Sequence, residues 1–281
     1  MVKIIKLPDC VTRIETDQPS LDVLQISDVH YDSMKCDREL LTKHLKEAEK
    51  RGAFVFINGD FFDVMQGKYD PRRTYDSIRP EYVKSNYLDE VVNDAVEYLS
   101  GFGVSYFFSE GNHESNIRER LSTDLIDRLV HGLKSNGVNC ERGMYKGWLI
   151  WVLTHGTARI PVRQHYHHGH GGNAPRSKGV LRVDIQMKNY PDADIITRGH
   201  DHNKWHIPSM VERLKGQGMK MRRMKKKVHN IQTGSYKKLG DAGWAVEKGF
   251  AEPTLGGYWT TLTAWKPMNK LSYKIEVTEA Q

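Results

Sequence analysis

Two histidines spaced one residue apart, His200 and His202, lie just after a short apolar run, 195–197. Side chains two positions apart on an extended chain point to the same side, so both imidazoles would face one point at the end of a strand. Taken alone, such a pair is more often an ordinary surface feature. Its importance depends on whether other segments carry matching residues.

Other apolar segments end in residues of the same kind. The runs 21–27, 53–58 and 104–109 are typical of buried strands, and a fourth strand end falls between residues 155 and 170. Ligand sites in parallel α/β sheets gather at the carboxyl ends of strands, so we expect these side chains to converge. The residues that follow the first three runs are Asp28 and His30, Asp60 and Asp63, and Asn112 and His113.

The residue types indicate a metal site. Carboxylates, an amide oxygen and neutral imidazoles suit Mn²⁺, Fe or Zn²⁺ better than Ca²⁺. The set contains no cysteine, which argues against a closed structural zinc site. It is also too large for one ion, so we expect two divalent ions, with Mn²⁺ as the first candidate, about 3.5–4 Å apart. Such a pair would lower the pKa of a shared water and neutralise charge on a phosphoryl group.

The elements that must position these residues alternate between strand and helix. Helical apolar spacing over 40–52, 83–101 and 117–137 follows the three buried strands. This alternation predicts an α/β fold with a largely parallel sheet covered by helices. After about residue 140 the pattern changes to hairpin-like strands, and we expect a single domain over 1–281. The aromatic-rich segment 256–265 is either a core strand pair or an assembly surface, and we favour the core.

The four motifs D-x-H, G-D-x-x-D, G-N-H-E and G-H-x-H, in this order at strand ends, resemble those of the calcineurin-like metallophosphoesterase superfamily. The resemblance runs from Asp28 to His202. It implies a central β-sandwich flanked by helices, with a two-metal site at the strand ends. It further implies that Asp28, His30 and His202 hold the first metal and that Asp60, a catalytic residue, bridges the two.

The same resemblance implies roles for the remaining motif residues. Asn112, His200 and one histidine from the fourth strand end would hold the second metal. His113 would contact the phosphate and protonate the leaving oxygen. Asp63 matches the second acid of its motif, and we expect it to orient the residues that bind the metals.

Two histidines compete for the fourth strand end, His155 and His168. The segment 148–167 is predicted to be a hairpin, which would separate the two by roughly 20 Å, so both cannot be ligands. We favour His168, because one helix-and-strand unit separates it from the next motif and a glycine-rich turn follows it. The run 167–179 also resembles a signature of a nuclease branch of the superfamily. The neighbouring histidines are His165, His167 and His170. They either line the substrate cleft or are solvated, and we favour the second interpretation.

The net charge of +7 has a local origin. The run 215–227 contains seven Lys and Arg residues and no acidic residue, while the remaining Lys and Arg equal the Asp and Glu in number. We expect a basic hairpin near 213–228, beside the metal site, and give a nucleic-acid contact and a solvated loop equal weight. The residues expected to bind phosphates are Arg222, Arg223, Lys225, Lys226 and Lys227.

These observations favour a phosphodiesterase, and among phosphodiesterases a nuclease acting on DNA. The protein serine/threonine phosphatase branch is unlike this chain, because the run 59–67 lacks its arginine and Tyr31 follows His30 where that branch has glycine. Two alternatives stay open. One is a phosphatase or phosphodiesterase acting on small nucleotides. The other is a non-catalytic metal-binding scaffold, which we disfavour because no ligand position of the motifs is empty.

Cysteine usage and hydropathy favour a cytoplasmic protein. Cys10, Cys36 and Cys140 are far apart and lack C-x-x-C spacing, as expected for free thiols in a reducing compartment. No apolar run approaches the length of a membrane span, and the first ten residues lack the apolar core of a secretion signal. We therefore expect no membrane partner. Oligomeric state does not follow from the sequence.

Overall fold

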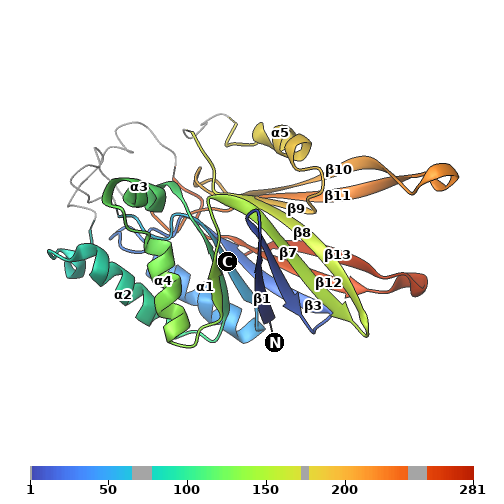
Figure 1. The fold of residues 1–281 in the computed structure, drawn as a ribbon. Helices are drawn as coiled ribbons and strands as arrows, with labels where there is room; N and C mark the ends of the chain where they lie inside the picture. The colour runs from blue at the N-terminus through green and yellow to red at the C-terminus, as the bar shows by residue number, and fades with distance from the viewer. Residues whose placement is uncertain (1, 65–77, 172–176, 240–251) are drawn as a thin grey trace.

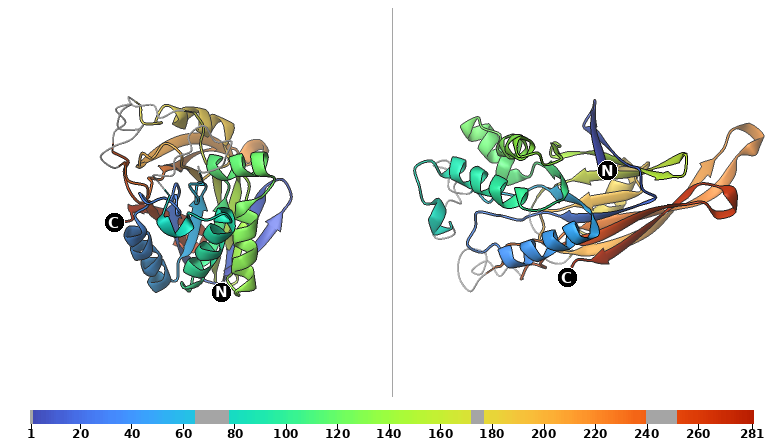
Figure 2. Two further views of the ribbon diagram at one scale, coloured as in Figure 1. Left: turned by 90° about the vertical axis from the view of Figure 1, so that its left-hand side faces the viewer. Right: turned by 90° about the horizontal axis from the view of Figure 1, so that it is seen from below.

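The computed structural model describes residues 2–64, 78–171, 177–239 and 252–281 (Figure 1). Two β-sheets pack face to face, and helices lie on their outer faces (Figures 1 and 2). This is the expected α/β fold with a central sandwich flanked by helices. Among the described residues, no helix combines the length and the apolar content needed to cross a membrane.

The first sheet has six strands in the order β13-β12-β3-β4-β5-β6. Four of them are parallel neighbours, which sends their carboxyl ends to one edge: β3 (Ser20–Ile26), β4 (Phe54–Asn58), β5 (Ser105–Ser109) and β6 (Cys140–Arg142). Of the other two strands, β12 (Tyr258–Trp265) pairs antiparallel with β3, and β13 (Ser272–Glu279) pairs antiparallel with β12.

Helices cover the outer face of this sheet. They are α1 (Arg38–Arg51), α2 (Tyr87–Ser100), α3 (Asn112–Leu121) and α4 (Leu125–Ser135), with 3₁₀ turns at Pro80–Tyr82, Gly218–Lys220 and Pro267–Asn269 elsewhere in the chain. Their apolar faces form the larger core with the sheet, where Leu41, Leu45, Val91 and Leu129 are fully buried. Burial of these faces stabilises the helices more than their intrinsic propensity does.

The second sheet has seven strands in the order β1-β2-β7-β8-β9-β11-β10. Its strands are β1 (Val2–Leu7), β2 (Val11–Thr16), β7 (Lys146–His155), β8 (Ala158–His167), β9 (Ile195–Arg198), β10 (Trp205–Lys215) and β11 (Arg222–Gln232). The single helix α5 (Arg182–Asn189) lies on its outer face (Figure 1). Its inner face packs on the first sheet, where Phe54 meets Trp151 and Phe56 meets Tyr166 with ring centroids 5.3 and 5.5 Å apart.

One expectation about the helices is wrong, and one pair of strands was not predicted. The single helix expected over 117–137 is two helices, because Ser122 takes a left-handed backbone (φ 54°) and Asp124 caps α4 by accepting from the amide of Asp127 at 2.9 Å. The N-terminal hairpin β1–β2 was not predicted. The segment 256–265 does lie in the core, as favoured, since Leu262 is fully buried.

The hairpin of β10 and β11 projects away from the rest of the molecule (Figures 1 and 2). Its strands pair without interruption from Trp205 opposite Gln232 to Lys215 opposite Arg222. Ten residue steps of about 3.3 Å place its tip roughly 30 Å beyond Trp205, which follows His202 by three residues. The expected position of the basic run beside the metal site is therefore wrong, because two strands of this length carry it away.

Candidate metal centre

The motif residues lie at one edge of the sandwich, just after the ends of parallel strands. Asp28 follows β3, Asp60 follows β4 and Asn112 follows β5 in the first sheet. In the second sheet, His168 follows β8 and His200 follows β9, and these two strands are also parallel. The polar residues that follow parallel strands of both sheets therefore lie together at one edge of the sandwich.

Six of these side chains form two adjacent groups. The ligand atoms of Asp28, His30 and His202 all lie within 4.8 Å of one another, and so do those of Asp60, His168 and His200. His202 Nε2 is 3.3 Å from Asp28 Oδ1, and His168 Nε2 is 3.1 Å from Asp60 Oδ2. His168 Nε2 also lies 4.0 Å from Asp28 Oδ1, so the two groups share a boundary.

The imidazoles of the second group are oriented by hydrogen bonds to backbone carbonyls. His168 Nδ1 donates to the carbonyl of Asn58 at 2.7 Å, because a carbonyl can only accept. His200 Nε2 donates to the carbonyl of Gly171 at 2.7 Å, which leaves His200 Nδ1 beside Asn112 Oδ1 at 2.8 Å. Each ring therefore turns its other nitrogen toward the cluster, which is the usual arrangement of metal-binding histidines.

The first group is oriented by Asp63. Its carboxylate lies 2.8 Å from His30 Nδ1, and Lys237 Nζ lies 2.6 Å from the same carboxylate. His30 Nε2 consequently faces His202 Nε2, 3.4 Å away. Burial lowers the pKa of His30 to about 4 even though Asp63 opposes this shift, so His30 is neutral and able to bind a metal at pH 7.

Three buried atoms at the centre make no well-aligned hydrogen bond in the described part of the chain, although each has an ionisable group within 3.3 Å: Asp28 Oδ1, His30 Nδ1 and His168 Nε2. Burial would raise the pKa of Asp28, but the His202 and His168 imidazoles outweigh it and hold this pKa at about 2. Burial would lower the pKa of His168, yet the Asp60 and Asp28 carboxylates raise it to about 10. The buried carboxylates therefore favour positive charge at this point, and the donor set fits divalent metals.

The backbone at these residues is strained. Five of them have left-handed φ values, which non-glycine residues rarely adopt: Asp28 (51°), His30 (50°), Asp60 (49°), His200 (73°) and His202 (53°). Each such residue costs about 1–3 kcal/mol and persists only where the surroundings enforce it. Here backbone bonds do so, since the amides of Asp28 and His30 donate to the carbonyls of Gly59 and Asp60, both at 3.1 Å.

The glycines of the motifs allow close approach between strand ends. A Cβ on Gly199 would lie 2.8 Å from Asp28 Oδ2, and a Cβ on Gly111 would collide with the side chain and the backbone nitrogen of Asp60. Both distances are shorter than real Cβ contacts allow. Gly199 and Gly111, which precede His200 and Asn112, are therefore required by crowding at the site.

His113 lies in the first turn of α3, beside the cluster. Its Nδ1 donates to the backbone carbonyl of Asp63, and its amide donates to Asp60 Oδ1 at 3.0 Å. These bonds leave His113 Nε2 directed toward the cluster, 3.7 Å from Asp60 Oδ2. A group in this position can exchange a proton with a molecule bound at the centre.

Two residues that support the site were missed in the sequence. The Glu114 carboxylate accepts from the amides of Asp60, Phe62 and Gly111 at 2.9 to 3.1 Å, and burial together with the Asp60 charge raises the pKa of Glu114 to about 8. Glu114 ends the G-N-H-E motif, so a signal for it existed. Lys237 carried no local signal, because it reaches Asp63 from a segment 174 residues away.

The structure separates the two competing histidines. His155 ends β7 opposite Ala158, whereas His167 at the other end of β8 pairs with Lys146, so His155 lies at the far end of that hairpin. His168 alone joins the cluster.

Of the neighbouring histidines, His165 is not solvated as expected. It is buried under α5 and stacks on Tyr190 with ring centroids 3.4 Å apart. His167 is partly buried and His170 is exposed. Residue 172 of the glycine-rich turn lies outside the described residues.

Four of the five residues expected to bind nucleic acid are exposed on the projecting hairpin: Arg222, Arg223, Lys225 and Lys227. Lys226 differs. Its Nζ lies 2.7 Å from Asp194 Oδ1 and donates to the carbonyl of Asp192, because it points to the face of the sheet that α5 covers. Lys226 is therefore not available to a phosphate.

Comparison with protein families matches residues 21–204 to a family described as calcineurin-like phosphoesterase. No curated protein sequence matches the chain. Similar solved structures include a conserved protein of Streptococcus pneumoniae, a predicted phosphoesterase, with 12% identity, a TM-score of 0.34 and coverage of 93% of this chain and 90% of that chain. GAP50 of Plasmodium, the anchor in the inner membrane complex, has 13% identity, a TM-score of 0.46 and coverage of 93% and 89%. Vps29 of Entamoeba histolytica has 13% identity, a TM-score of 0.36 and coverage of 92% and 99%.

Proposed function

This chain belongs to the calcineurin-like phosphoesterase family, and we propose that it is a metal-dependent phosphodiesterase that acts on DNA. Family membership supports phosphoester hydrolysis. The choice of a diester and of DNA rests on the charge and shape of the chain itself. We also propose a cytoplasmic location, which the three free cysteines support.

The proposed ligands divide between two divalent cations. Asp28, His30 and His202 would hold one cation. Asn112, His168 and His200 would hold the other, with Asp60 between the two. Mn²⁺ is the first candidate, and Fe and Zn²⁺ suit the same donors. When bound, such cations lower the pKa of water and neutralise charge on the phosphoryl group.

The protein side chains would supply proton transfer and orientation. His113 Nε2 would donate a proton to the leaving oxygen, while the bond from His113 Nδ1 to the Asp63 carbonyl keeps the ring in place. Asp63 would hold the His30 ring and would itself be held by Lys237.

One observation supports catalysis most strongly: Asp28 Oδ1 and His168 Nε2 are buried at the centre of inward-turned imidazoles without a well-aligned hydrogen bond. A scaffold that had lost its metals would have no reason to keep such a costly arrangement. The left-handed backbone at five of the proposed ligands supports the same conclusion.

The basic hairpin supports a long polyanionic substrate. Its tip lies roughly 30 Å beyond Trp205, a length that corresponds to about nine base pairs of duplex at 3.4 Å per pair. A short nucleotide bound at the metals could not reach it, whereas a DNA strand could. Lys and Arg there would contact phosphates without reading bases.

The test compares two variants with four charges removed each. The hairpin variant changes Arg222, Arg223, Lys225 and Lys227 to Gln, and the control variant changes Lys3, Lys43, Lys46 and Lys50, which are exposed elsewhere. We expect only the hairpin variant to weaken DNA binding and to lower the salt slope, by about one unit per lost phosphate contact. The ratio of kcat/KM on DNA to kcat/KM on bis-p-nitrophenyl phosphate should fall with it.

Equal salt slopes in the two variants would remove the support for DNA and favour a small-nucleotide substrate. A panel of duplex DNA, single-stranded DNA, RNA, cyclic nucleotides and phosphomonoesters, each with Mn²⁺, would then identify it. Wild-type protein that neither binds Mn²⁺ nor hydrolyses any of these would instead be a scaffold.

A further inference from the structure

A buried arginine beside the metal centre has no partner. Arg198, the last residue of β9, is 2% exposed, and its Nε and Nη2 have no hydrogen-bond partner in the described part of the chain. No carboxylate of the described residues forms an ion pair with it, and the nearby Asp201 pairs with Arg182 instead. Burying a guanidinium in this way is strongly unfavourable, so its presence indicates a ligand that the protein alone does not supply.

The strand register places the Arg198 side chain on the outer face of the second sheet. Side chains alternate along β9, where Ile195 belongs to the core between the sheets and Ile196 to the small core under α5. Arg198 therefore shares the α5 side with Ile196. Its neighbours across the sheet are His167 on β8 and Gln232 on β11.

A second guanidinium, that of Arg182 at the start of α5, lies on the same side of the sheet as Arg198. Arg182 reaches Asp201, which follows Arg198 by three residues. Arg182 Nη1 lies 3.3 Å from Asp201 Oδ2, and Arg182 is a quarter exposed. Among the described residues, Asp201 pairs with Arg182 and no carboxylate pairs with Arg198, so one positive charge is left without compensation.

The arginine pair borders the metal centre. Arg182 Nη2 packs on Gly171, where it would lie 3.1 Å from an added Cβ. The carbonyl of Gly171 accepts from His200 Nε2 at 2.7 Å. Gly171 therefore contacts both Arg182 and a proposed metal ligand. Arg198 is two residues from His200 along the chain.

We propose that Arg198 and Arg182 bind a second phosphate of the substrate, next to the phosphate that is cleaved. Guanidinium groups match phosphate oxygens with paired N–H donors, and a dianionic phosphate would supply the missing negative charge. Arg182 would be the exposed member of the pair and Arg198 the buried one. The inference rests on the proposed function and specifies its substrate as one that carries at least two neighbouring phosphates.

The first test uses metal-free protein, so that it does not depend on activity. Inorganic phosphate should raise the Tm of wild-type protein in EDTA, because a ligand that binds the native state stabilises it. The rise should be absent in Arg198→Met and reduced in Arg182→Gln, while it persists in Arg159→Met, a control at an exposed position of β8. It should also persist in the hairpin variant, which removes the other cluster of positive charge.

The variant's own stability separates a ligand site from a structural role. Arg198→Met without phosphate should have a Tm equal to or above that of wild type, because it removes an unpaired buried charge. If Arg198→Met instead has a much lower Tm or does not fold, Arg198 also stabilises the fold, and Arg182→Gln decides the test. A reduced phosphate effect in Arg182→Gln would then support the proposal, and an unchanged effect would overturn it.

The second test uses protein loaded with Mn²⁺ and compares a thymidine dinucleotide with the same dinucleotide carrying a 5′-phosphate. In wild type the added phosphate should lower KM by about tenfold, as expected for a charged hydrogen-bonded contact. In Arg198→Met most of this difference in KM should be lost. If Arg198→Met instead leaves the two dinucleotides unchanged and raises the KM for ATP, the second phosphate belongs to a small nucleotide.

The outcomes distinguish this inference from the proposed function. A phosphate effect on Tm that depends on Arg198, with no hydrolysis of any diester, would keep the anion site and reject the phosphodiesterase. Hydrolysis of diesters with equal KM values for the two dinucleotides, and no Tm effect of phosphate, would keep the phosphodiesterase and reject the site.

Discussion

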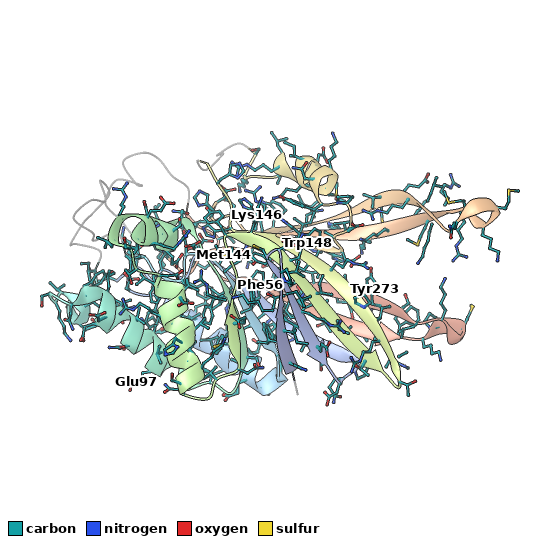
Figure 3. The ribbon with its side chains drawn as sticks, viewed as in Figure 1. Phe56, Glu97, Met144, Lys146, Trp148 and Tyr273 are labelled. Atoms are coloured by element: carbon teal, nitrogen blue, oxygen red, sulfur yellow. The ribbon has the colours of Figure 1, made fainter. Side chains whose placement is uncertain are left out.

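The metal centre and the β10–β11 hairpin are built in opposite ways. The centre takes side chains from strand ends spread over both sheets, buries most of them and strains the backbone of five. The hairpin consists of two consecutive strands in unbroken register, and the side chains of its outer part stand clear of the molecule (Figure 3). Asp28 is 0% exposed, whereas Leu214 near the hairpin tip is 69% exposed.

This difference predicts how far the effects of a substitution extend through the molecule. Each residue of the centre depends on partners far away in the sequence, so one change should disturb metal binding, stability and activity together. The outer hairpin depends on its own pairing and turn, so changes there should remain local. The following predictions test this contrast.

The largest expected effect is that of Asp60→Asn. Because the Asp60 carboxylate lies within reach of both groups of ligands, its neutralisation should remove both metals and reduce activity by at least about 10³-fold. Metal content after dialysis and hydrolysis of bis-p-nitrophenyl phosphate measure the two effects. Retention of one full metal equivalent would show that Asp60 does not lie between two ions.

The second largest effect is expected for His113→Ala. We expect kcat to fall by about 10²–10⁴-fold with both metals still bound, because His113 is proposed to transfer a proton and not to hold a metal. The same two measurements apply. Loss of a metal in this variant would make His113 a ligand, as its proximity to His30 and Asp60 allows.

A smaller effect is expected for Gly111→Ala. The new Cβ would collide with Asp60, so we expect a loss of roughly 1–3 kcal/mol in the free energy of unfolding, seen as a lower Tm. Gly101→Ala is the matched control, because its Cβ would have 3.3 Å to the nearest atom, the carbonyl oxygen of Tyr98. Equal Tm values for the two variants would contradict crowding as the reason for the glycine.

The smallest effect on the centre is expected when the hairpin is shortened. Replacing residues 212–225 by Asn-Gly would join the paired residues Val211 and Lys226 through a tight turn and keep the ion pair of Lys226 with Asp194. Metal content and hydrolysis of bis-p-nitrophenyl phosphate should stay close to wild type, while the salt dependence of DNA binding should weaken. Loss of metal would mean that the two regions are coupled after all.

Much of the fold was predictable from local patterns. Strands β3, β4 and β5 are continuous apolar runs because helices and the second sheet bury both of their faces. The break between α3 and α4 was missed, because the helical spacing of apolar residues continues through Ser122 while its backbone does not. Hairpin β1–β2 was missed since its strands are short and partly exposed at the edge of a sheet.

The candidate site was predictable to the extent that its residues stand in short motifs. Asp28, Asp60 and Asn112 each follow a recognisable strand, so their type and order alone indicated a common site. The supporting groups follow no such rule. Lys237 reaches Asp63 from a distant segment, and only the folded chain brings the two together.

The amino-acid sequence by itself determined the chemistry of the centre. The types and spacing of its carboxylates and imidazoles are local facts, and parallel strands must bring their ends to one edge. Only the tertiary structure decided the choice of His168 over His155, the pairing of Lys226 with Asp194, and the isolation of Arg198. These depend on strand length, on register and on which face of a sheet each side chain meets. Such quantities are fixed by contacts between segments far apart in the chain, and no short stretch of sequence records them.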